Sequence, residues 1–491
     1  GFVMDSLIGF VAKAVAARYL ERADFGTISI GVAALSLLGG VVLLGMKQGV
    51  VRHVPRADTI RERRGYLVSA YEIVLLSVGA ISALIFFLAE PIAVRAFSDP
   101  ELTPIFRIVA VGLPFSTLLS LGIGVVRAEG ITAPKVIVQN FVMPVSRFLL
   151  VIIGVVLGVQ AAGIMSAYAL AYVSGFVVIL YFVYKHSPLF DSEPYDSKHA
   201  QLIVFSIPLM FSSLMSQLLA KVDTLLIGVF QSSAVAADYD IAYTLATLMF
   251  MILMSFEYLF LPIFSEHHSD GELQRARSFY ETITKWVFLG TLPLFFGMFL
   301  FPVFVIQFAF GGDYVSGASA LRIVALGFLF HALVGPNTGA LTAFGYTKFI
   351  LATDIAATGS NILLNLLLIP RYGIEGAAFA TFFSYTVRNG TQIGWLYYKQ
   401  DVSPFSPGLV RPSTVSTILM VALYGAFRAL FEPSVLPLLG LLTVAGLLYP
   451  VVIVVFGGVG DDEIMIIESV EDRFELNLDM VGRLAERVRR Y

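Results

Sequence analysis

This chain contains about fourteen apolar stretches, each roughly twenty consecutive residues long. The length of these stretches constrains the fold more than any other feature of the sequence. Hydrophobic residues make up 57% of the 491 positions, charged residues only 14%, and the mean hydropathy is +0.84. A helix rises about 1.5 Å per residue, so each stretch can cross about 30 Å of hydrocarbon. Backbone groups inside lipid need partners within their own segment. The sequence therefore predicts an all-α integral membrane protein.

The second half of the chain repeats part of the first half. The heptapeptide FRIVAVG at 106–112 opens one apolar stretch, and LRIVALG at 321–327 opens another. The offset between the copies is about 214 residues throughout, as expected of an internal structural repeat. The further matching pairs are Gly130 with Gly345, Lys135 with Lys348, Gly163 with Gly376, and Tyr172 with Tyr385.

The apolar stretches group into two halves of six spans and a C-terminal pair. We place the spans at 1–17, 27–45, 66–89, 106–126, 136–157, 161–184, 202–230, 242–264, 286–310, 321–342, 349–370, 376–397, 413–431 and 436–456. Residue 1 is already inside a span, so we expect residues before it. The predicted domains are an N-lobe at 1–185, a C-lobe at 202–399, two further spans within 413–456, and a cytoplasmic amphipathic tail at 461–491.

The basic residues between spans predict the orientation of the chain. Connections that follow even-numbered spans hold about four times as many Lys and Arg as the opposite connections, and basic loops stay in the cytoplasm. The connection with Arg61, Arg63 and Arg64 is the clearest case. Both termini are then cytoplasmic. With six spans per half, the two copies are parallel repeats, related by a rotation of about 180° around the membrane normal.

The sequence lacks the motifs that most enzyme chemistry needs. It has no cysteine, which excludes thiolate catalysis and disulfides, and its six histidines are scattered. HExxH, Walker A and GxSxG motifs are missing, and the external loops are short. We therefore expect a protein that is not an enzyme and that needs neither a cofactor nor a metal. A net charge of -3 gives no indication of nucleic-acid binding.

Basic residues inside the predicted spans suggest a site. Lys13, Arg147, Lys221 and Arg388 lie in spans one, five, seven and twelve. A charge at mid-bilayer costs about 2.5–3.5 kcal/mol or more unless it faces protein or water. Lys13 and Lys221 each follow an alanine in the first span of a half, so the repeat would bring both to one cavity. Cations with few acids predict a chamber that binds an anion such as a phosphate or diphosphate.

Other readings of these lysines stay open. Lys13 lies near a span end, where a long side chain can reach the outer interface. Lys221 can be neutralised by a carboxylate such as Asp223 or Glu257.

Uncharged polar residues follow the same spans at helical spacing. Gln217, Asn361, Asn365 and Tyr385 belong to polar stripes that we expect to line the same interior. The alternative is that these side chains form hydrogen bonds that hold neighbouring helices together.

Acidic residues inside the spans are candidates for coupling transport to an ion. The candidates are Asp223, Glu257 and Asp354. Alternatively, each of these carboxylates forms an ion pair with a buried cation.

Several segments resemble a known family. They are 19–56, 310–327, 340–349 and 361–385, of which NILLNLLLIPRYGIEGAA at 361–378 is the most specific. These segments closely resemble the polysaccharide-transporter branch of the MOP exporter superfamily, the Wzx-like flippases, over essentially all of 19–456. Archaeal members that flip dolichyl-phosphate-linked sugars are the most similar, judged by the acidic tail.

The resemblance implies a carrier with fourteen helices in a V-shaped, MATE-like pair of lobes and without ATPase activity. It would move a polyprenyl-linked sugar from the cytoplasmic to the outer leaflet of the cell membrane by alternating access, for polysaccharide or glycoprotein glycan assembly. Its partners would be the lipid-linked glycan, the bilayer and glycan assembly enzymes. Two other readings are a MATE-type antiporter of drugs or metabolites and a scaffold that transports nothing.

The orientation can be tested with tags. A tag between Arg61 and Arg64 and another at the C-terminus should both react only from the cytoplasmic side, and a tag near Gly312 should react only from outside. Labelling of intact cells and of inverted vesicles measures this. An even number of spans places both termini on the same side of the membrane. An external C-terminus would therefore contradict fourteen spans with a cytoplasmic N-terminus.

Overall fold

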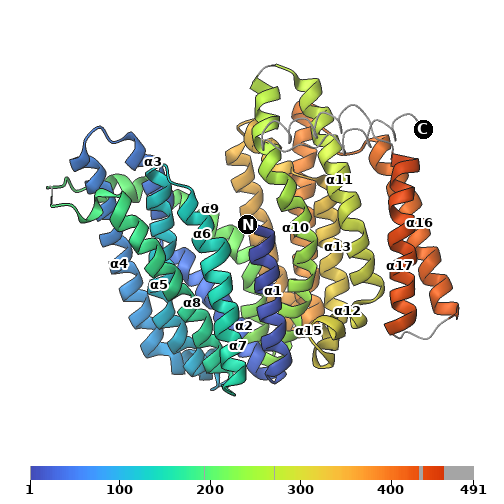
Figure 1. The fold of residues 1–491 in the computed structure, drawn as a ribbon, viewed down its shortest axis with the longest axis horizontal. Coiled ribbons are helices and arrows are strands. Elements are labelled where there is room, and N and C mark those ends of the chain that lie inside the picture. Colours follow the sequence, from blue (N-terminus) through green and yellow to red (C-terminus); the bar gives the residue numbers. More distant parts are fainter. Residues whose placement is uncertain (1, 193, 270, 431–434, 458–491) are drawn as a thin grey trace. The chain divides into compact units, whose positions relative to one another are not determined.

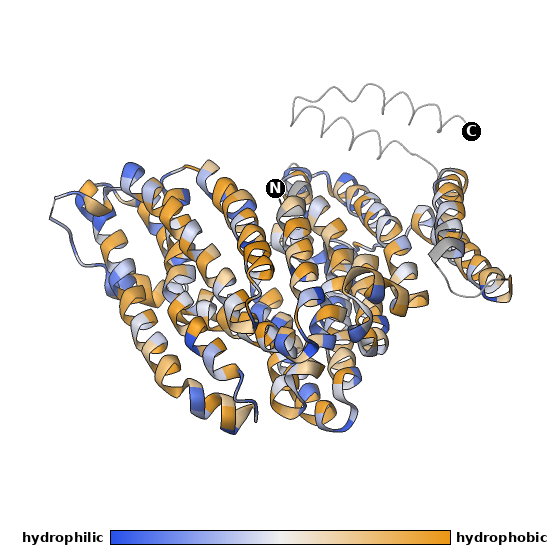
Figure 2. Ribbon diagram, turned by 60° about the horizontal axis from the view of Figure 1, so that its bottom comes forward, coloured by the Kyte–Doolittle hydropathy of each residue, from blue (hydrophilic) through white to orange (hydrophobic). Residues whose placement is uncertain are grey.

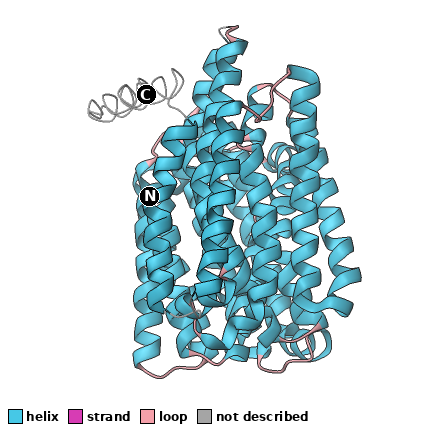
Figure 3. Ribbon diagram, turned by 90° about the vertical axis from the view of Figure 1, so that its right-hand side faces the viewer, coloured by secondary structure: helices cyan, strands magenta, loops and turns pink. Residues whose placement is uncertain are grey.

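The computed structural model describes residues 2–192, 194–269, 271–430 and 435–457. Every regular element in these ranges is helical (Figure 3). The predicted tail at 461–491 lies outside the described residues. The all-α membrane fold predicted from the sequence is confirmed.

The helices follow one another with short connections. The α-helices are α1 (Phe2–Tyr19), α2 (Arg22–Val42), α3 (Met46–His53), α4 (Ile60–Pro91), α5 (Leu102–Ala128), α6 (Ala133–Ile137), α7 (Met143–Val156), α8 (Ala161–His186), α9 (His199–Phe230), α10 (Ser233–Ser269), α11 (Leu273–Leu300), α12 (Pro302–Ala309), α13 (Ala318–Val334), α14 (Asn337–Ala343), α15 (Thr347–Gln400), α16 (Pro407–Leu430) and α17 (Val435–Val452). Short 3₁₀ helices are η1 (Val54–Arg56), η4 (Pro188–Phe190) and η5 (Gly312–Gly317). Segments η2 (Ile92–Ala96), η3 (Val138–Val142) and η6 (Ile453–Gly457) are π-helical.

Among the described residues, eleven helices are long and apolar enough to cross a membrane. Helices α1 and α17 lie at the predicted first and last spans, outside that set of eleven. The count of about fourteen spans therefore stays a prediction. The long helices are largely hydrophobic along their length (Figure 2). On α4, Leu76 and Phe87 are 77% and 79% exposed, as expected of side chains that face lipid.

Helix α15 is two helical segments joined at Gly373. Its 54 residues would extend about 80 Å, far more than one crossing needs. Gly373 has φ 56° and ψ −131°, a conformation that side chains with a Cβ strongly disfavour. The chain can therefore turn there between the predicted eleventh and twelfth spans, 349–370 and 376–397.

The chain divides into two compact units. Unit 1 contains 1–244, 303–321 and 354–384, and unit 2 contains 245–302, 322–353 and 385–491. In unit 1, α5 packs against α2, α3, α4 and α8, and α9 packs against α2 (Figure 1). Met46, Leu67, Leu121 and Ile179 belong to one fully or almost fully buried core there. The lobes predicted at 1–185 and 202–399 follow a different division and stay a prediction.

Unit 2 has an aromatic core of its own. Phe260 on α10 stacks on Phe279 of α11 with ring centroids 5.6 Å apart, and Phe264 packs against Phe260. The Tyr280 hydroxyl donates to the backbone carbonyl of Val334. Helix α16 packs against α11 and α17. Large aromatic side chains thus supply much of the apolar area buried in this unit.

Replacing Gly373 with alanine should destabilise the protein. An L-residue held in this conformation costs about 1–3 kcal/mol, so Gly373→Ala should lower the thermal midpoint in detergent. Gly359→Ala is a matched control on the same helix, because a Cβ there would meet open space. Alanine at a helical position should leave stability unchanged or raise it slightly. Equal midpoints for the two variants would contradict a break at Gly373.

Candidate substrate-binding site

Unit 1 contains a small pocket, here called the cationic pocket, into which three basic side chains converge. Lys13 comes from α1, Arg147 from α7 and Lys221 from α9, and Asp240 of α10 is the acidic residue in the lining. The cavity has a volume of about 180 Å³. Lys13, Arg147 and Lys221 are three of the four cations that the sequence predicted for one chamber.

An ion pair organises the cationic pocket. The Lys13 Nζ atom lies 2.6 Å from Asp240 Oδ2 and donates to Thr244 Oγ1 at 2.5 Å. The Ser29 hydroxyl donates to the same Asp240 oxygen at 2.7 Å. Lys221 also interacts electrostatically with Asp240. Among the described lining residues, three formal positive charges face one negative charge, a formal charge of +2.

The third cation, Arg147, is held by close packing. Its guanidinium carbon lies 5.7 Å from the centroid of the Tyr168 ring, within the range of a cation–π contact. Gly9 is also close, because a Cβ added there would lie 2.7 Å from the Arg147 Nη2 atom. A larger residue at position 9 would therefore require the flexible end of Arg147 to shift.

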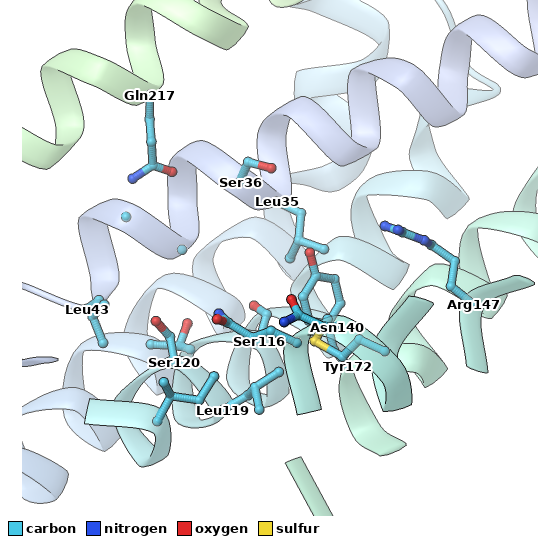
Figure 4. A pocket seen from close by; sticks show the side chains of 16 residues that line it. Leu35, Ser36, Leu43, Ser116, Leu119, Ser120, Asn140, Arg147, Tyr172 and Gln217 are labelled. Carbon is cyan, nitrogen blue, oxygen red and sulfur yellow. The ribbon is translucent and has the colours of Figure 1, made fainter. Parts of the chain in front are cut away.

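Arg147 also lines a second, larger cavity, here called the polar chamber. This cavity of about 500 Å³ lies between α2, α5, η3, α7, α8 and α9 (Figure 4). Its lining includes hydroxyl and amide side chains and several leucines, with Arg147 as the charged member. Gln217, predicted to line the interior, does so here. Because Arg147 belongs to both linings, the polar chamber adjoins the cationic pocket.

Asp223 lies in a different environment, a buried network of neutral partners. Tyr239 and Thr381 donate hydrogen bonds to Asp223 Oδ2, and Asn365 Nδ2 donates to Oδ1 at 2.6 Å. Asn365 also donates to Asn361 Oδ1 at 3.1 Å. Asn361 and Asn365 are both fully buried. The structure thus brings the predicted residues Asp223, Asn361 and Asn365 together, with Tyr239 and Thr381 added.

The other predicted site residues are placed elsewhere. Arg388 and Tyr385 belong to unit 2, where Arg388 Nη2 lies 3.4 Å from Thr338 Oγ1 and Tyr385 packs against Phe328. Glu257 is partly buried in the same unit. Asp354 is 7% exposed in unit 1.

Sequence reasoning missed Asp240, the carboxylate closest to the lysines. Its candidates for neutralising Lys221 were Asp223 and Glu257, and the eighth span was placed at 242–264. In the structure α10 begins at Ser233, so Asp240 lies within a helix. The hydropathy pattern placed the start of the span too late because Asp238 and Asp240 lower the local average. The available signal was a pair of acids, Asp238 and Asp240, separated by one residue and placed just before a predicted span.

Comparisons with known proteins agree with this architecture. The lipid II flippase MurJ, in an inward closed conformation, superposes with a TM-score of 0.75 at 15% identity, covering 93% of this chain and 97% of MurJ. An inward-facing multidrug resistance MATE family transporter of the MOP superfamily superposes with a TM-score of 0.68 at 13% identity, covering 81% and 94%. These similarities define the class: a membrane protein with the fold of MOP-superfamily transporters.

The chain belongs to the polysaccharide biosynthesis protein family, whose profile (Polysacc_synt_3) matches residues 15–319. It is 23% identical over 424 residues to Agl15 of Haloferax volcanii, described as a probable low-salt glycan biosynthesis flippase, covering 84% of this chain and 85% of that protein. AglR of the same organism, a probable flippase, is 25% identical over 34% of this chain and 35% of that protein. The resemblance to polysaccharide flippases of the MOP superfamily is confirmed. These relatives are transporters, which confirms the prediction that the chain is not an enzyme.

Proposed function

We propose that this chain is a flippase that moves a polyprenyl-phosphate-linked sugar, on a dolichyl or undecaprenyl carrier, from the cytoplasmic to the outer leaflet of the cell membrane. The product would supply polysaccharide or glycoprotein glycan assembly. The cationic pocket is the observation that carries this proposal. Family membership and the likeness to a probable glycan biosynthesis flippase support it.

The charge of the pocket suits a phosphate. Lys13 is paired with Asp240 and Lys221 interacts with the same carboxylate, so two ammonium groups share one carboxylate. At an effective dielectric constant of about 20, a pair of unit charges about 4 Å apart gains about 4 kcal/mol, several times the value in water. A phosphate or diphosphate in this pocket would neutralise the excess charge, while its polyprenyl chain stays in the bilayer.

The membrane potential would favour the proposed direction. Moving one negative charge outward across an inside-negative membrane releases about 2.3 kcal/mol per 100 mV. A phosphate-linked lipid can therefore move outward without ATP.

Alternating access would require contacts at one end of unit 1 to break and re-form. Arg22 on α2 pairs with Asp238 on α10, and Ser316 donates to the same carboxylate at 2.7 Å. The Tyr314 hydroxyl donates to the Ala17 carbonyl at 2.8 Å. The bonds of Arg22 and of Tyr314 join the start of the chain to segments more than two hundred residues away, and we propose that these contacts form a gate.

Asp223 is our candidate for coupling to an ion. Its hydrogen-bond partners Asn365, Thr381 and Tyr239 are neutral, so a proton or a small cation would balance the charge of this carboxylate. Glu257 and Asp354 stay as further candidates.

A MATE-type antiporter is the alternative function, because the fold is shared with a multidrug resistance transporter. A pocket for organic cations would have an excess of acidic groups, whereas Lys13, Lys221 and Arg147 line the cationic pocket. Lipid movement by the purified protein alone would exclude a scaffold that transports nothing. Glycan assembly enzymes would then be partners of the protein that are not required for transport.

Lysine variants test the flippase proposal. Lys13→Ala and Lys221→Ala should each lower flipping by about tenfold or more, because a hydrogen bond to a charged group contributes about 1.5–3 kcal/mol. Lys221→Arg should retain part of the activity. Flipping is followed in proteoliposomes as access of an external quencher to a fluorescent polyprenyl-phosphate sugar.

Lys185→Ala is a suitable control, since Lys185 lies in the exposed last turn of α8. Full activity of the Lys13→Ala/Lys221→Ala double variant would rule out the cationic pocket as the binding site. Uptake of organic cations by the same vesicles, without lipid movement, would favour the antiporter.

Asp223→Asn tests ion coupling. The amide keeps the size of the side chain and removes its charge, so flipping should lose its response to an imposed sodium or proton gradient while expression is retained. Asp191→Asn, at an exposed position, should keep the wild-type response. An unchanged gradient response of Asp223→Asn would show that this carboxylate is not the coupling group.

A further inference from the structure

Directly beside the cationic pocket lies the polar chamber, and no acidic residue is among the described residues that line it. The polar chamber has a volume of about 500 Å³, within the ~300–1,000 Å³ typical of small-molecule sites. Its lining has many hydroxyl and amide groups, among them Ser116, Ser120, Asn140 and Gln217, and the single charge of Arg147. The hydroxyl and amide groups of this lining can both donate and accept hydrogen bonds. Away from Arg147, the described lining residues include no charged side chain that could pair with a second charge on the ligand.

The amides of the polar chamber are available to a ligand. Within the part of the chain that the structure describes, the side chains of Asn140 and Gln217 have no hydrogen-bond partner, and both residues are only half-buried. Ser116 uses its hydrogen to bond the Leu113 carbonyl at 3.0 Å, which leaves its oxygen as an acceptor. Figure 4 shows Ser116, Asn140 and Tyr172 near one another, with Gln217 approaching from another helix. In the absence of a ligand these groups would bind water, which sugar hydroxyls can replace without loss of hydrogen bonds.

The backbone is irregular at the same place. Asn140 lies in the π-helical segment η3 (Val138–Val142), which interrupts the helical stretch between α6 and α7. A π-helical turn gives up regular i→i−4 hydrogen bonds and turns side chains to new directions, and such turns occur frequently at functional sites. The turn therefore supports a binding role for Asn140 that does not depend on the volume of the cavity.

We infer that the polar chamber binds the sugar adjoining the phosphate and that it selects uncharged sugars over acidic ones. The inference rests on the proposed function for the phosphate, which would occupy the cationic pocket with Arg147 at the boundary between the two. A neutral sugar forms hydrogen bonds with Asn140 and Gln217. The carboxylate of a uronic acid would lose its hydration without gaining a cation, because the charge of Arg147 is shared with the phosphate.

Binding to the purified, detergent-solubilised protein tests the inference without requiring transport. Glucose 1-phosphate, glucuronic acid 1-phosphate and inorganic phosphate are titrated by calorimetry. Wild-type protein should bind glucose 1-phosphate about tenfold more tightly than inorganic phosphate, with each amide hydrogen bond contributing a factor of about three or more. Glucuronic acid 1-phosphate should bind more weakly than glucose 1-phosphate.

Variants distinguish the chamber from the pocket. The Asn140→Leu/Gln217→Leu double variant should bind glucose 1-phosphate no more tightly than inorganic phosphate, with the affinity for inorganic phosphate unchanged. Gln160→Leu, at an exposed position before α8, is the control and should keep the wild-type preference. In proteoliposomes, the double variant should move polyprenyl phosphate like wild type but polyprenyl-phosphate glucose about tenfold more slowly.

The possible outcomes distinguish a failure of the proposed sugar site from a failure of the proposed flippase function. Equal affinity of wild type for glucose 1-phosphate and inorganic phosphate would overturn the sugar site, whatever the protein transports. A retained preference for glucose 1-phosphate in the double variant would also overturn it. Failure of wild type to move any polyprenyl lipid would instead contradict the proposed flippase, and the binding preference would still decide the role of the chamber.

Discussion

The ion pair between Lys13 and Asp240 shows the constraint on which unit 1 depends: a charge inside a membrane protein needs a partner. Asp240 accepts from Lys13 at 2.6 Å and from Ser29 at 2.7 Å. Removing one partner of a buried ion pair typically costs about 3–5 kcal/mol, since the remaining charge stays desolvated. The requirement joins α1 and α2 to α10, although these helices are more than two hundred residues apart in the sequence.

Charges in unit 1 differ in how completely they are compensated. Asp238 is paired with Arg22 and also accepts from Ser316. Asp223 is surrounded by neutral donors instead. In the cationic pocket the compensation is incomplete, because Lys221 shares Asp240 with Lys13, which already binds that carboxylate. A site that retains excess charge within its own lining is one where a charged ligand can supply the missing partner.

The two adjoining cavities differ in the chemistry of their linings. Charged groups gather in the smaller cavity, and hydroxyl and amide groups gather in the larger one. Arg147 lies at their boundary, held against Tyr168 and close to Gly9. A ligand with one anionic and one neutral part would match this division. An organic cation, the typical substrate of a multidrug antiporter, would match neither part.

The sequence by itself determined the membrane class, the helical fold and the family. Apolar length and backbone hydrogen bonding leave only helices in lipid, and the segment at 361–378 carried the family resemblance. The sequence also singled out Lys13, Arg147 and Lys221, because a charge within an apolar span is conspicuous. Only the tertiary structure revealed Asp240, the polar chamber and the π-helical turn at Asn140. A cavity and an ion pair are formed by helices distant in sequence, and no periodicity within one helix records which face meets which neighbour.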